Sequence, residues 1–234
     1  SVAVIGASPD PHSLRGRIME VMGCHDVDIP IYPISRSHDE IMGLKAYKAI
    51  ADTPTRVDLA ILIIPAEHIP GALEDCATVG VKAALILASG FAEDHSEGGE
   101  DLQQRVLDIQ ARTGMLICGP NSEGFANMTT RLCATFSPAV EGKAMELMPA
   151  WSTAGRIAVV AQSGGMGFAF YDRARAKEMR FSHVVTTGNE ACLESLDVVD
   201  HLITADEADV FLMFMEDVKT PEKLAIVAEK ALRA

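Results

Sequence analysis

The sequence predicts an α/β protein with parallel sheets covered by helices, and two observations carry this prediction. Short, nearly continuous apolar segments recur along the chain, for example at 2–6, 58–65 and 156–163. Strands that are apolar on both faces are typical of parallel sheets with helices on both sides. Segments with a helical pattern alternate with these strands, and such alternation indicates a doubly wound architecture.

Taken in order, each predicted strand is a short apolar segment and each predicted helix is a longer segment with helical periodicity. We expect strands at 2–6, 29–34, 58–65, 81–89, 115–119, 156–163, 182–188 and 208–216. We expect helices at about 14–22, 67–79, 97–113, 165–179, 194–204 and 220–232.

The periodicity lapses between about 125 and 155, where Pro, Gly, Ser and Thr are frequent. This composition predicts a linker. We therefore expect a first domain at 1–125, an interdomain linker at 126–155 and a second domain at 156–234. The second domain holds only three strand–helix units, so we expect it to be incomplete in this sequence.

Composition narrows the function classes. The chain has 234 residues, 48% of them hydrophobic, which is enough for one large or two modest domains. Its net charge of −13 argues against nucleic acid as a partner, although a local basic group would still suit a small polyanion. No run of 18 apolar residues occurs, so no membrane span is expected.

Cysteine and histidine usage points to a reducing compartment without a structural metal. The five cysteines are scattered and never form a C-x-x-C pair, which favours buried free thiols and a cytoplasmic location. The seven histidines show no metal-ligand spacing, so we expect no metal site.

Small and polar residues follow almost every predicted strand. In open α/β sheets ligands bind beyond the carboxyl ends of the strands, so these residues are the candidate site. Tight βα turns favour the same residue types for structural reasons, and only their number and order favour function. The turns contain Gly6-Ala7-Ser8, Ser35-Arg36, Pro65-Ala66, Ser89-Gly90, Asn121, Ser163-Gly164-Gly165, Asn189-Glu190 and Glu216.

The first turn lacks the dinucleotide fingerprint G-x-G-x-x-G, because Ser8 stands where the second glycine belongs. The turn Gly6–Ser8, at a predicted helix start, offers backbone N–H groups to an anion. Ser8 and Ser13 add hydroxyl donors. The guanidinium groups of Arg17 and Arg36 suit phosphate, although Arg17 equally fits a solvated helix face.

The segment "AVVAQSGGMG" repeats this arrangement in the second domain. Ser163, Gly164 and Gly165 follow a strand and precede a helix, so they predict a second anion site. Glu216 ends the apolar segment "ADVFLMFME". We expect it to be buried, and a buried carboxylate is costly without a partner, which favours a functional role.

The motifs "GAS…RG", "YPIS", "DLAILIIPAE", "ALILASGFAE", "GPNSEGFAN", "AVVAQSGGMG", "TTGNEA" and "FMEDV" occur in one linear order. Together they resemble the CoA-binding and ligase-like domains of nucleoside-diphosphate-forming acyl-CoA synthetases, such as ADP-forming acetate–CoA ligase. The α subunit of succinyl-CoA synthetase is a more distant relative. The resemblance implies a Rossmann-like CoA-binding domain followed by a flavodoxin-like, succinyl-CoA-ligase-like α/β domain.

The resemblance also implies roles for these residues. Asn121 would lie at the acyl centre, Ser163 would belong to the phosphate turn with Gly164 and Gly165, and Glu216 would orient a catalytic histidine. The CoA-binding residues would be Gly6, Ala7, Ser8, Ser13, Arg17, Ser35, Arg36, Pro65, Ala66, Ser89, Gly90 and Asn121. Glu123 follows "GPNS" in place of a small or apolar residue, which leaves the acyl substrate open.

The implied reaction interconverts acyl-CoA, ADP and phosphate with a small carboxylic acid, CoA and ATP through an acyl phosphate and a phosphohistidine. No S-H-T-G loop for that histidine occurs in this sequence. ATP or ADP with Mg²⁺ is expected on a separate ATP-grasp domain or subunit in a homo- or hetero-oligomer. This chain alone is then expected to bind CoA without completing the reaction.

Three other functions remain open from the sequence. An NADP-dependent oxidoreductase would use Ser35-Arg36 after the second strand. A serine hydrolase would use Ser163 in "AQSGG" with Asp197 and His201, although the last two lie on one predicted helix. A CoA-sensing regulatory module fused to an acetyltransferase is the third.

Overall fold

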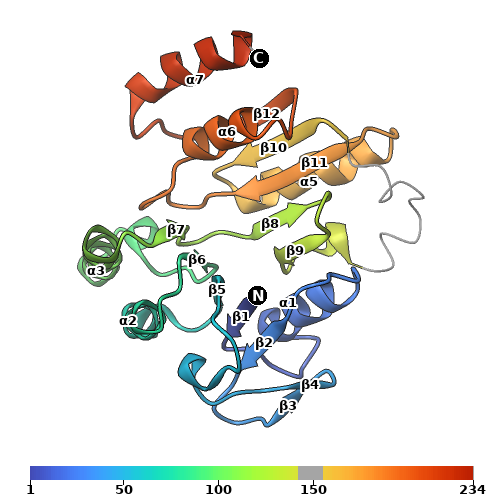
Figure 1. Cartoon of the computed structure of the whole chain (residues 1–234). Coiled ribbons are helices and arrows are strands. Elements are labelled where there is room, and N and C mark those ends of the chain that lie inside the picture. The colour runs from blue at the N-terminus through green and yellow to red at the C-terminus, as the bar shows by residue number, and fades with distance from the viewer. Residues whose placement is uncertain (142–154, 234) are drawn as a thin grey trace.

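A computed structural model of the chain describes residues 1–141 and 155–233, and it contains two five-stranded sheets with helices against them (Figure 1). The first sheet is entirely parallel, with strand order β2-β1-β5-β6-β7. Its strands are β1 (Val2–Ile5), β2 (Ile31–Ile34), β5 (Leu59–Leu62), β6 (Ala83–Ile86) and β7 (Leu116–Cys118). The parallel α/β architecture expected from the apolar segments is confirmed for this sheet.

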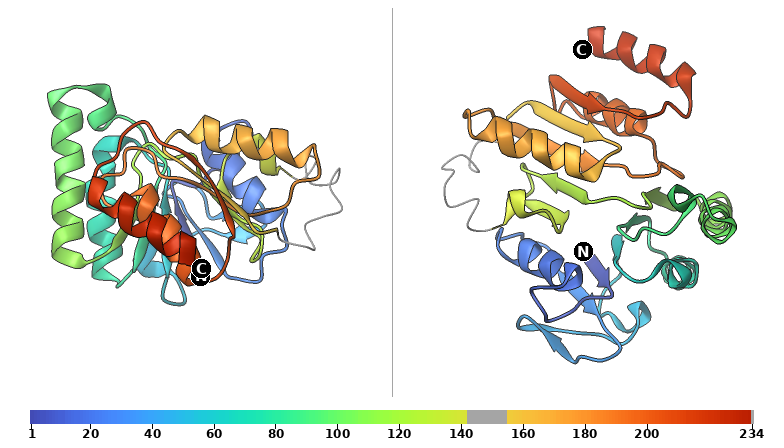
Figure 2. Two further views of the ribbon diagram at one scale, coloured as in Figure 1. Left: turned by 90° about the horizontal axis from the view of Figure 1, so that it is seen from above. Right: turned by 180° about the vertical axis from the view of Figure 1, so that it is seen from behind.

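Helices cover both faces of the first sheet (Figure 2). On one face, α1 (Leu14–Gly23) packs through Ile18 and Met22 against Val2 and Val4 of β1. On the other face lie α2 (Ile69–Thr78) and α3 (Glu97–Thr113), which pack in the cluster that contains Ala3. Alternate residues of β1 therefore point into two different apolar cores, which is why the strand is apolar throughout.

The second sheet is mixed, with strand order β12-β10-β11-β8-β9. Strands β10 (Ile157–Ala161), β11 (Phe181–Thr186) and β12 (Val210–Phe214) are parallel, whereas β8 (Gly124–Asn127) runs antiparallel to both β11 and β9 (Leu132–Thr135). Helix α5 (Gly164–Arg175) packs on one face, and α6 (Ser195–Thr204) and α7 (Pro221–Arg233) pack on the other.

Short elements complete the described residues. A two-stranded ribbon joins β3 (Glu40–Ile41) to β4 (Leu44–Lys45). Four 3₁₀ turns lie at Ile50–Asp52, Ala66–His68, Ala92–Asp94 and Pro138–Val140. No helix among the described residues is long and apolar enough to cross a membrane.

The hairpin β8–β9 was missed by the sequence analysis, which expected no strand between 126 and 155. Both strands are only four residues long and mix polar with apolar side chains, so their periodicity is too short to detect. They sit at the edge of the second sheet, directly after the last turn of the first. The domain limits at 125 and 155 stay a prediction, and residues 142–154 of the expected linker lie outside the described residues.

The helix predicted at about 14–22 is confirmed, but the turn Gly6–Ser8 does not lead directly into it. Helix α1 begins at Leu14, and Ser13 caps it by accepting a hydrogen bond from the Gly16 N–H at 3.1 Å. Two prolines in "SPDPHS" oppose an earlier start, because each restricts the residue before it to extended backbone. Asp10 then turns the chain, since its carbonyl accepts from both the N–H and the hydroxyl of Ser13.

Candidate functional site

A large cleft, the main cleft, lies where the turns of the two sheets face each other. Its volume is about 1020 Å³. The first sheet contributes residues after β5, β6 and β7 together with the start of α1, and the second contributes residues after β10, β11 and β12. The residues used below are Ser13, Arg15, Ser89, Glu93, Asn121, Glu123, Gln162, Ser163, Gly164, Gly165, Asn189, Glu216 and Lys219.

A second cavity, the side cleft, lies at the ends of β1 and β2 and has a volume of about 630 Å³. It is lined by Gly6–Ser8 and by the turn that follows β2. Cations outnumber carboxylates around it: the charged lining residues are Arg15, Arg36, Lys48 and Arg105 against Glu67 and Asp75. The side cleft therefore offers a small polyanion a local basic surface in an acidic protein.

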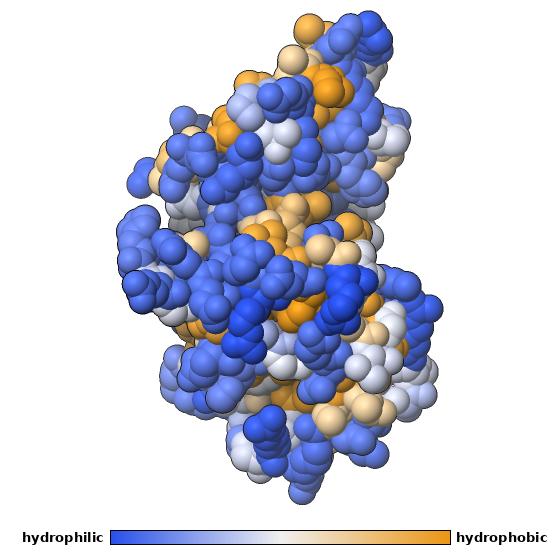
Figure 3. Space-filling model, turned by 90° about the vertical axis from the view of Figure 1, so that its left-hand side faces the viewer, coloured by the Kyte–Doolittle hydropathy of each residue, from blue (hydrophilic) through white to orange (hydrophobic). Residues whose placement is uncertain are grey.

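The two clefts meet at Arg15 and Ile64, which line both. This junction lies at the carboxyl ends of β1 and β5, where the strand order of the first sheet reverses. Such a switch point is where open α/β sheets bind their ligands. Figure 3, which looks at the left-hand side of Figure 1, shows apolar surface between hydrophilic residues across the middle of the molecule.

Gly6 is required by close packing at this junction. Its φ is +96°, and a Cβ placed on it would lie 2.6 Å from the carbonyl oxygen of Ile63. Only glycine combines that backbone conformation with that approach. The first turn is therefore shaped by contact with the strand end of β5, and it leaves Ser8 beside the side cleft.

Two helix N-termini reach the main cleft. Ser163 caps α5 by accepting a hydrogen bond from the Met166 N–H at 3.4 Å, and Ser13 caps α1 in the same way from Gly16. A Cβ placed on Gly165 would meet nothing within 4 Å, so the turn is open above this residue. The positive ends of both helix dipoles and their first N–H groups favour an anion here.

Glu123 places a carboxyl group beside the turn of α5. A Cβ on Gly164 would lie 2.6 Å from the Glu123 Cβ and 3.0 Å from its Oε2, so the glycine makes room for this side chain. Burial raises the pKa of Glu123, and a hydrogen bond with Ser137 opposes that shift. The carboxyl group is thus held half-buried against the expected phosphate position.

Gln162 connects the three turns of the second sheet. Its Oε1 accepts from the N–H groups of Glu216 and Asp217 at 2.6 and 3.0 Å. Its Nε2 donates to Glu190 Oε2 and to the Asp217 carbonyl, both at 2.8 Å. Glu190 is buried beneath the cleft and also accepts hydrogen bonds from Thr187 and Ser195. This network holds the backbone of Glu216 in place beside the cleft.

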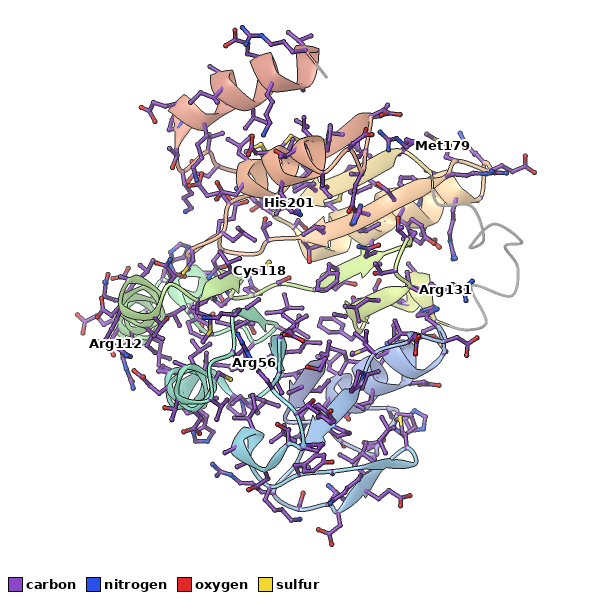
Figure 4. All side chains as sticks on the ribbon, in the orientation of Figure 1. Arg56, Arg112, Cys118, Arg131, Met179 and His201 are labelled. Carbon is purple, nitrogen blue, oxygen red and sulfur yellow. The ribbon has the colours of Figure 1, made fainter. Side chains whose placement is uncertain are left out.

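The turns of the two sheets also bond directly to each other. The Asn189 N–H donates to the Pro120 carbonyl at 2.9 Å, and the Ser122 hydroxyl donates to the Thr186 carbonyl at 2.6 Å. Cys118, labelled in Figure 4, lies on β7 at the same junction, where its thiol donates to the Thr186 carbonyl. Burial raises the pKa of Cys118 to about 12, so this thiol stays protonated.

The structure distributes the sequence-predicted residues over both clefts. Gly6, Ala7, Ser8, Ser35 and Arg36 line the side cleft. The main cleft collects Ser13, Pro65, Ser89, Asn121, Ser163, Gly164, Gly165 and Glu216. Their assignment to particular ligand groups stays a prediction.

Three predicted residues lie elsewhere. Arg17 pairs with Glu141, its Nε 3.1 Å from Oε1, and lines neither cleft. Ala66 is buried in the core behind Pro65. Gly90 lines neither cleft and has a φ of +100°.

The expected burial of Glu216 is wrong. Strand β12 ends two residues earlier, and the carboxylate is exposed at the mouth of the cleft. Gln162 holds its backbone N–H while its side chain is left free to face the cleft. The desolvation argument for a functional Glu216 therefore does not apply, and only its position supports such a role.

Several lining residues had no predicted role. Glu93, Gln162 and Lys219 line the main cleft, and Lys48 and Arg105 line the side cleft. Glu93 follows "ASGF" within a turn already singled out, so its position was a usable signal. Arg105 lies in the middle of α3, where nothing local distinguishes it from a solvated helix residue.

The residues named for the serine hydrolase alternative do not form a catalytic triad. Asp197 pairs with Lys223 at 2.7 Å and accepts from the Glu194 N–H, while His201 is exposed on α6. All seven histidines lie within the described residues, and none lines the main cleft. No group of three or more His, Cys, Asp or Glu within the described ranges is arranged to hold a metal.

The fold and the clefts define an open α/β protein with two connected clefts at the switch point of its parallel sheet. The chain belongs to the CoA binding domain family, whose model matches residues 1–128, more than half of the sequence. Residues 154–234 match the succinyl-CoA ligase like flavodoxin domain. These matches confirm the resemblance inferred from the turn motifs and both parts of the expected fold.

The chain is similar to ADP-forming acetate–CoA ligases. It is 33% identical to acetate–CoA ligase [ADP-forming] I of Archaeoglobus fulgidus, covering 99% of this chain and 32% of that protein. It is 32% identical to the α subunit of acetate–CoA ligase [ADP-forming] I of Pyrococcus furiosus, covering 98% of this chain and 48% of that subunit.

A solved structure agrees with these relatives. The dinucleotide-forming acetyl-coenzyme A synthetase 1 of Candidatus Korarchaeum cryptofilum, in complex with phosphate and ADP, superimposes with a TM-score of 0.87. That match has 30% identity and covers 98% of this chain and 47% of the other. The chain thus spans 32% to 48% of the length of these relatives.

Proposed function

We propose that this chain is the CoA-binding and ligase-like part of an ADP-forming acyl-CoA synthetase. The observation that carries the proposal is the continuity of the two clefts through Arg15, which joins a basic pocket to an open helix N-terminus. CoA has a highly charged nucleotide end and a long pantetheine arm, and a ligand of that shape needs two connected sites of this kind.

On this proposal the nucleotide of CoA occupies the side cleft. Gly6, Ala7 and Ser8 face its pyrophosphate, and Ser35 and Arg36 assist at the phosphates. The pantetheine arm passes Arg15 into the main cleft along Pro65 and Ser89, while Ala66 packs in the core next to Pro65 and the Gly90 N–H holds the lining residue Glu93. Ser13 lies beside this path at the start of α1.

Phosphate occupies the turn Ser163–Gly165, where the N–H groups of α5 stabilise its charge. Asn121 lies across the cleft near the thiol end of CoA, and Glu216 stands at the mouth. In the direction of ATP formation, phosphate attacks the thioester carbonyl, the carbon–sulfur bond breaks, and CoA leaves as the thiolate. The products are an acyl phosphate and CoA, which takes up a proton.

The remaining phosphoryl transfers need groups from outside this chain. No histidine of the described residues lines the main cleft, so the phosphohistidine and an ATP-grasp module with ADP and Mg²⁺ come from another domain or subunit. The α-subunit relative supports a partner of this kind in a homo- or hetero-oligomer. The scattered cysteines, which never form a C-x-x-C pair, support a reducing cytoplasm as the location.

Calorimetric titration of this chain with CoA tests the first part of the proposal. We expect CoA to bind and NADPH not to bind. Arg36→Ala should weaken the affinity for CoA about tenfold, because it removes a charged contact to a phosphate. Arg173→Ala, an exposed arginine on α5, is the matched control and should leave affinity unchanged. Tight NADPH binding without CoA binding would instead favour an oxidoreductase.

A substitution at the open turn tests the phosphate site. Gly165→Asp adds a negative charge where a side chain meets no neighbour, so it should raise the KM for phosphate in the intact synthetase at least tenfold. Gly98→Asp is the control, because it adds the same charge to the first turn of α3 and also meets nothing within 4 Å. Equal effects of the two substitutions would argue against the assignment. ADP release across short aliphatic, dicarboxylic and aryl acids would identify the acyl substrate.

A further inference from the structure

The Glu93 carboxylate joins a turn of the first sheet to a turn of the second. Glu93 lies in the 3₁₀ turn Ala92–Asp94 after β6. Its Oε1 accepts a hydrogen bond from the Gly90 N–H at 2.7 Å, and its Oε2 accepts from the side-chain Nδ2 of Asn189. Glu93 and Asn189 both line the main cleft, so this contact is part of its wall.

An ionised carboxylate determines the orientation of the amide that it contacts. Burial alone raises the pKa of Glu93, but hydrogen bonds from Asn189 and Gly90 outweigh burial and hold the pKa below its usual value. At neutral pH the group is therefore an acceptor only. Asn189 must turn its NH₂ group toward Glu93, and that NH₂ group also donates to Gln103 Oε1 at 3.1 Å.

The orientation of the Asn189 amide in turn determines that of the Asn121 amide. With its NH₂ group committed, Asn189 has only its Oδ1 left, and this oxygen accepts from Asn121 Nδ2 at 3.3 Å. Asn121 thereby commits one N–H to Asn189. No described residue donates to the Asn121 Oδ1, and Asn121 is exposed to the main cleft.

We propose that Glu93 is a positioning residue that acts through Asn189 to fix the Asn121 amide, so that its oxygen accepts a hydrogen bond from the pantetheine arm of CoA. The inference rests on the proposed function, in which that arm lies in the main cleft. The arm carries two amide N–H groups and a thiol, and each of these is a donor that suits a fixed carbonyl oxygen.

Backbone contacts hold the same turns independently of Glu93. The N–H groups of Asn189, Ala191 and Leu193 donate to the carbonyls of Pro120, Gly119 and Ile117 at 2.9, 3.1 and 3.1 Å. Loss of the Glu93 charge should therefore leave the turn after β11 in place. Its main effect is to release the amide orientation of Asn189 and hence that of Asn121.

The test compares CoA with adenosine 3′,5′-bisphosphate, which lacks the pantetheine arm. Calorimetric titration of the Glu93→Gln variant should show CoA binding about tenfold weaker and bisphosphate binding unchanged. Glu97→Gln, an exposed glutamate in the first turn of α3, is the control and should change neither. A general loss of structure would weaken both ligands.

A second substitution tests the direction of the hydrogen bonds. Asn189→Asp alone places two carboxylates together and should weaken CoA. Combined with Glu93→Gln, it should restore CoA affinity to within about threefold of that of the unaltered chain. In the double variant the introduced amide at position 93 would donate a hydrogen bond to the introduced carboxylate at position 189, and that carboxylate still accepts one from Asn121. Asn121→Ala should weaken the binding of CoA and leave the binding of the bisphosphate unchanged. If either of the other variants fails to fold, this difference between the two ligands can still be measured with Asn121→Ala.

The outcomes separate this inference from the proposed function. If the unaltered chain binds CoA but Glu93→Gln changes neither ligand, or both equally, the positioning role is overturned and CoA binding stands. Failure of Asn189→Asp to rescue Glu93→Gln also overturns it. If the unaltered chain binds neither CoA nor the bisphosphate, the proposed function fails and the inference fails with it.

Discussion

Thr186→Val is the sharpest test of how β11 is bonded to the start of β8 behind the main cleft. The side chain lies at the end of β11 and is completely buried. Its Oγ1 accepts from the Glu123 N–H at 3.0 Å and donates to the Gly124 carbonyl at 2.8 Å. Valine has nearly the same shape, so the substitution removes these hydrogen bonds without opening a large cavity.

The expected cost follows from the two backbone groups that lose their partner. Each buried polar group left unsatisfied costs about 1–3 kcal/mol, and the added methyl group returns part of this. We therefore expect the free energy of unfolding to fall by about 2–4 kcal/mol. For a chain of this size that corresponds to a decrease in Tm of roughly 5–15 °C.

Urea unfolding followed by circular dichroism measures this change. Thr78→Val is the matched control, because the Thr78 hydroxyl donates to the Glu74 carbonyl at 3.0 Å on an exposed helix surface. The control should change stability by less than about 0.5 kcal/mol. If Thr186→Val is no more destabilising than Thr78→Val, the buried hydrogen bonds between Thr186 and the start of β8 do not contribute to stability.

Three further predictions follow from single positions. Gly6→Ala should lower Tm and weaken CoA binding in calorimetry, because its Cβ would lie 2.6 Å from Ile63, whereas Gly23→Ala meets nothing within 4 Å and should do neither. Burial raises the pKa of Glu123 above 4.5, so the folded state loses stability as pH rises from 4.5. Glu123→Gln should therefore stabilise the chain at about pH 7 in urea unfolding, and the gain should vanish near about pH 4. Burial lowers the pKa of His183 below 6.5, so stability falls as pH drops below 6.5, and His183→Leu should flatten that fall between pH 6.5 and about pH 5. A gain for Glu123→Gln that is independent of pH, or an unchanged acid dependence in His183→Leu, would refute the respective argument.

Most of the fold could be predicted because each long element carries its own signal. Helix α3 occupies the expected residues 97–113, with Ser96 as its cap and Gly114 in a left-handed conformation at its end. The strands of the parallel first sheet are apolar on both faces, which marks them without reference to neighbours. The hairpin β8–β9 carries no such signal, because its pairing with β11 depends on tertiary contacts.

The candidate site was predictable in part, for a similar reason. Turns after strands identify positions beside a cleft, and most of the residues named from the turns do line one. What a turn cannot show is the direction of a side chain. Arg17 turns to Glu141 while Arg15, two residues away on the same helix, lines both clefts. Helix geometry separates these side chains by about 200°, and the sequence gives no reason to prefer one.

The charges of the main cleft indicate how it would hold phosphate. Four carboxylates, those of Glu93, Glu123, Glu216 and Asp217, line it against two cations, Arg15 and Lys219. Side-chain charge therefore opposes an anion there, in contrast to the basic side cleft. On our proposal phosphate is held by the backbone N–H groups and dipole of α5, with Glu123 protonated or displaced when phosphate binds. Since salt screens the charged side chains of the side cleft, and uncharged backbone groups hold the phosphate, phosphate binding should depend on ionic strength less than binding of the CoA nucleotide does.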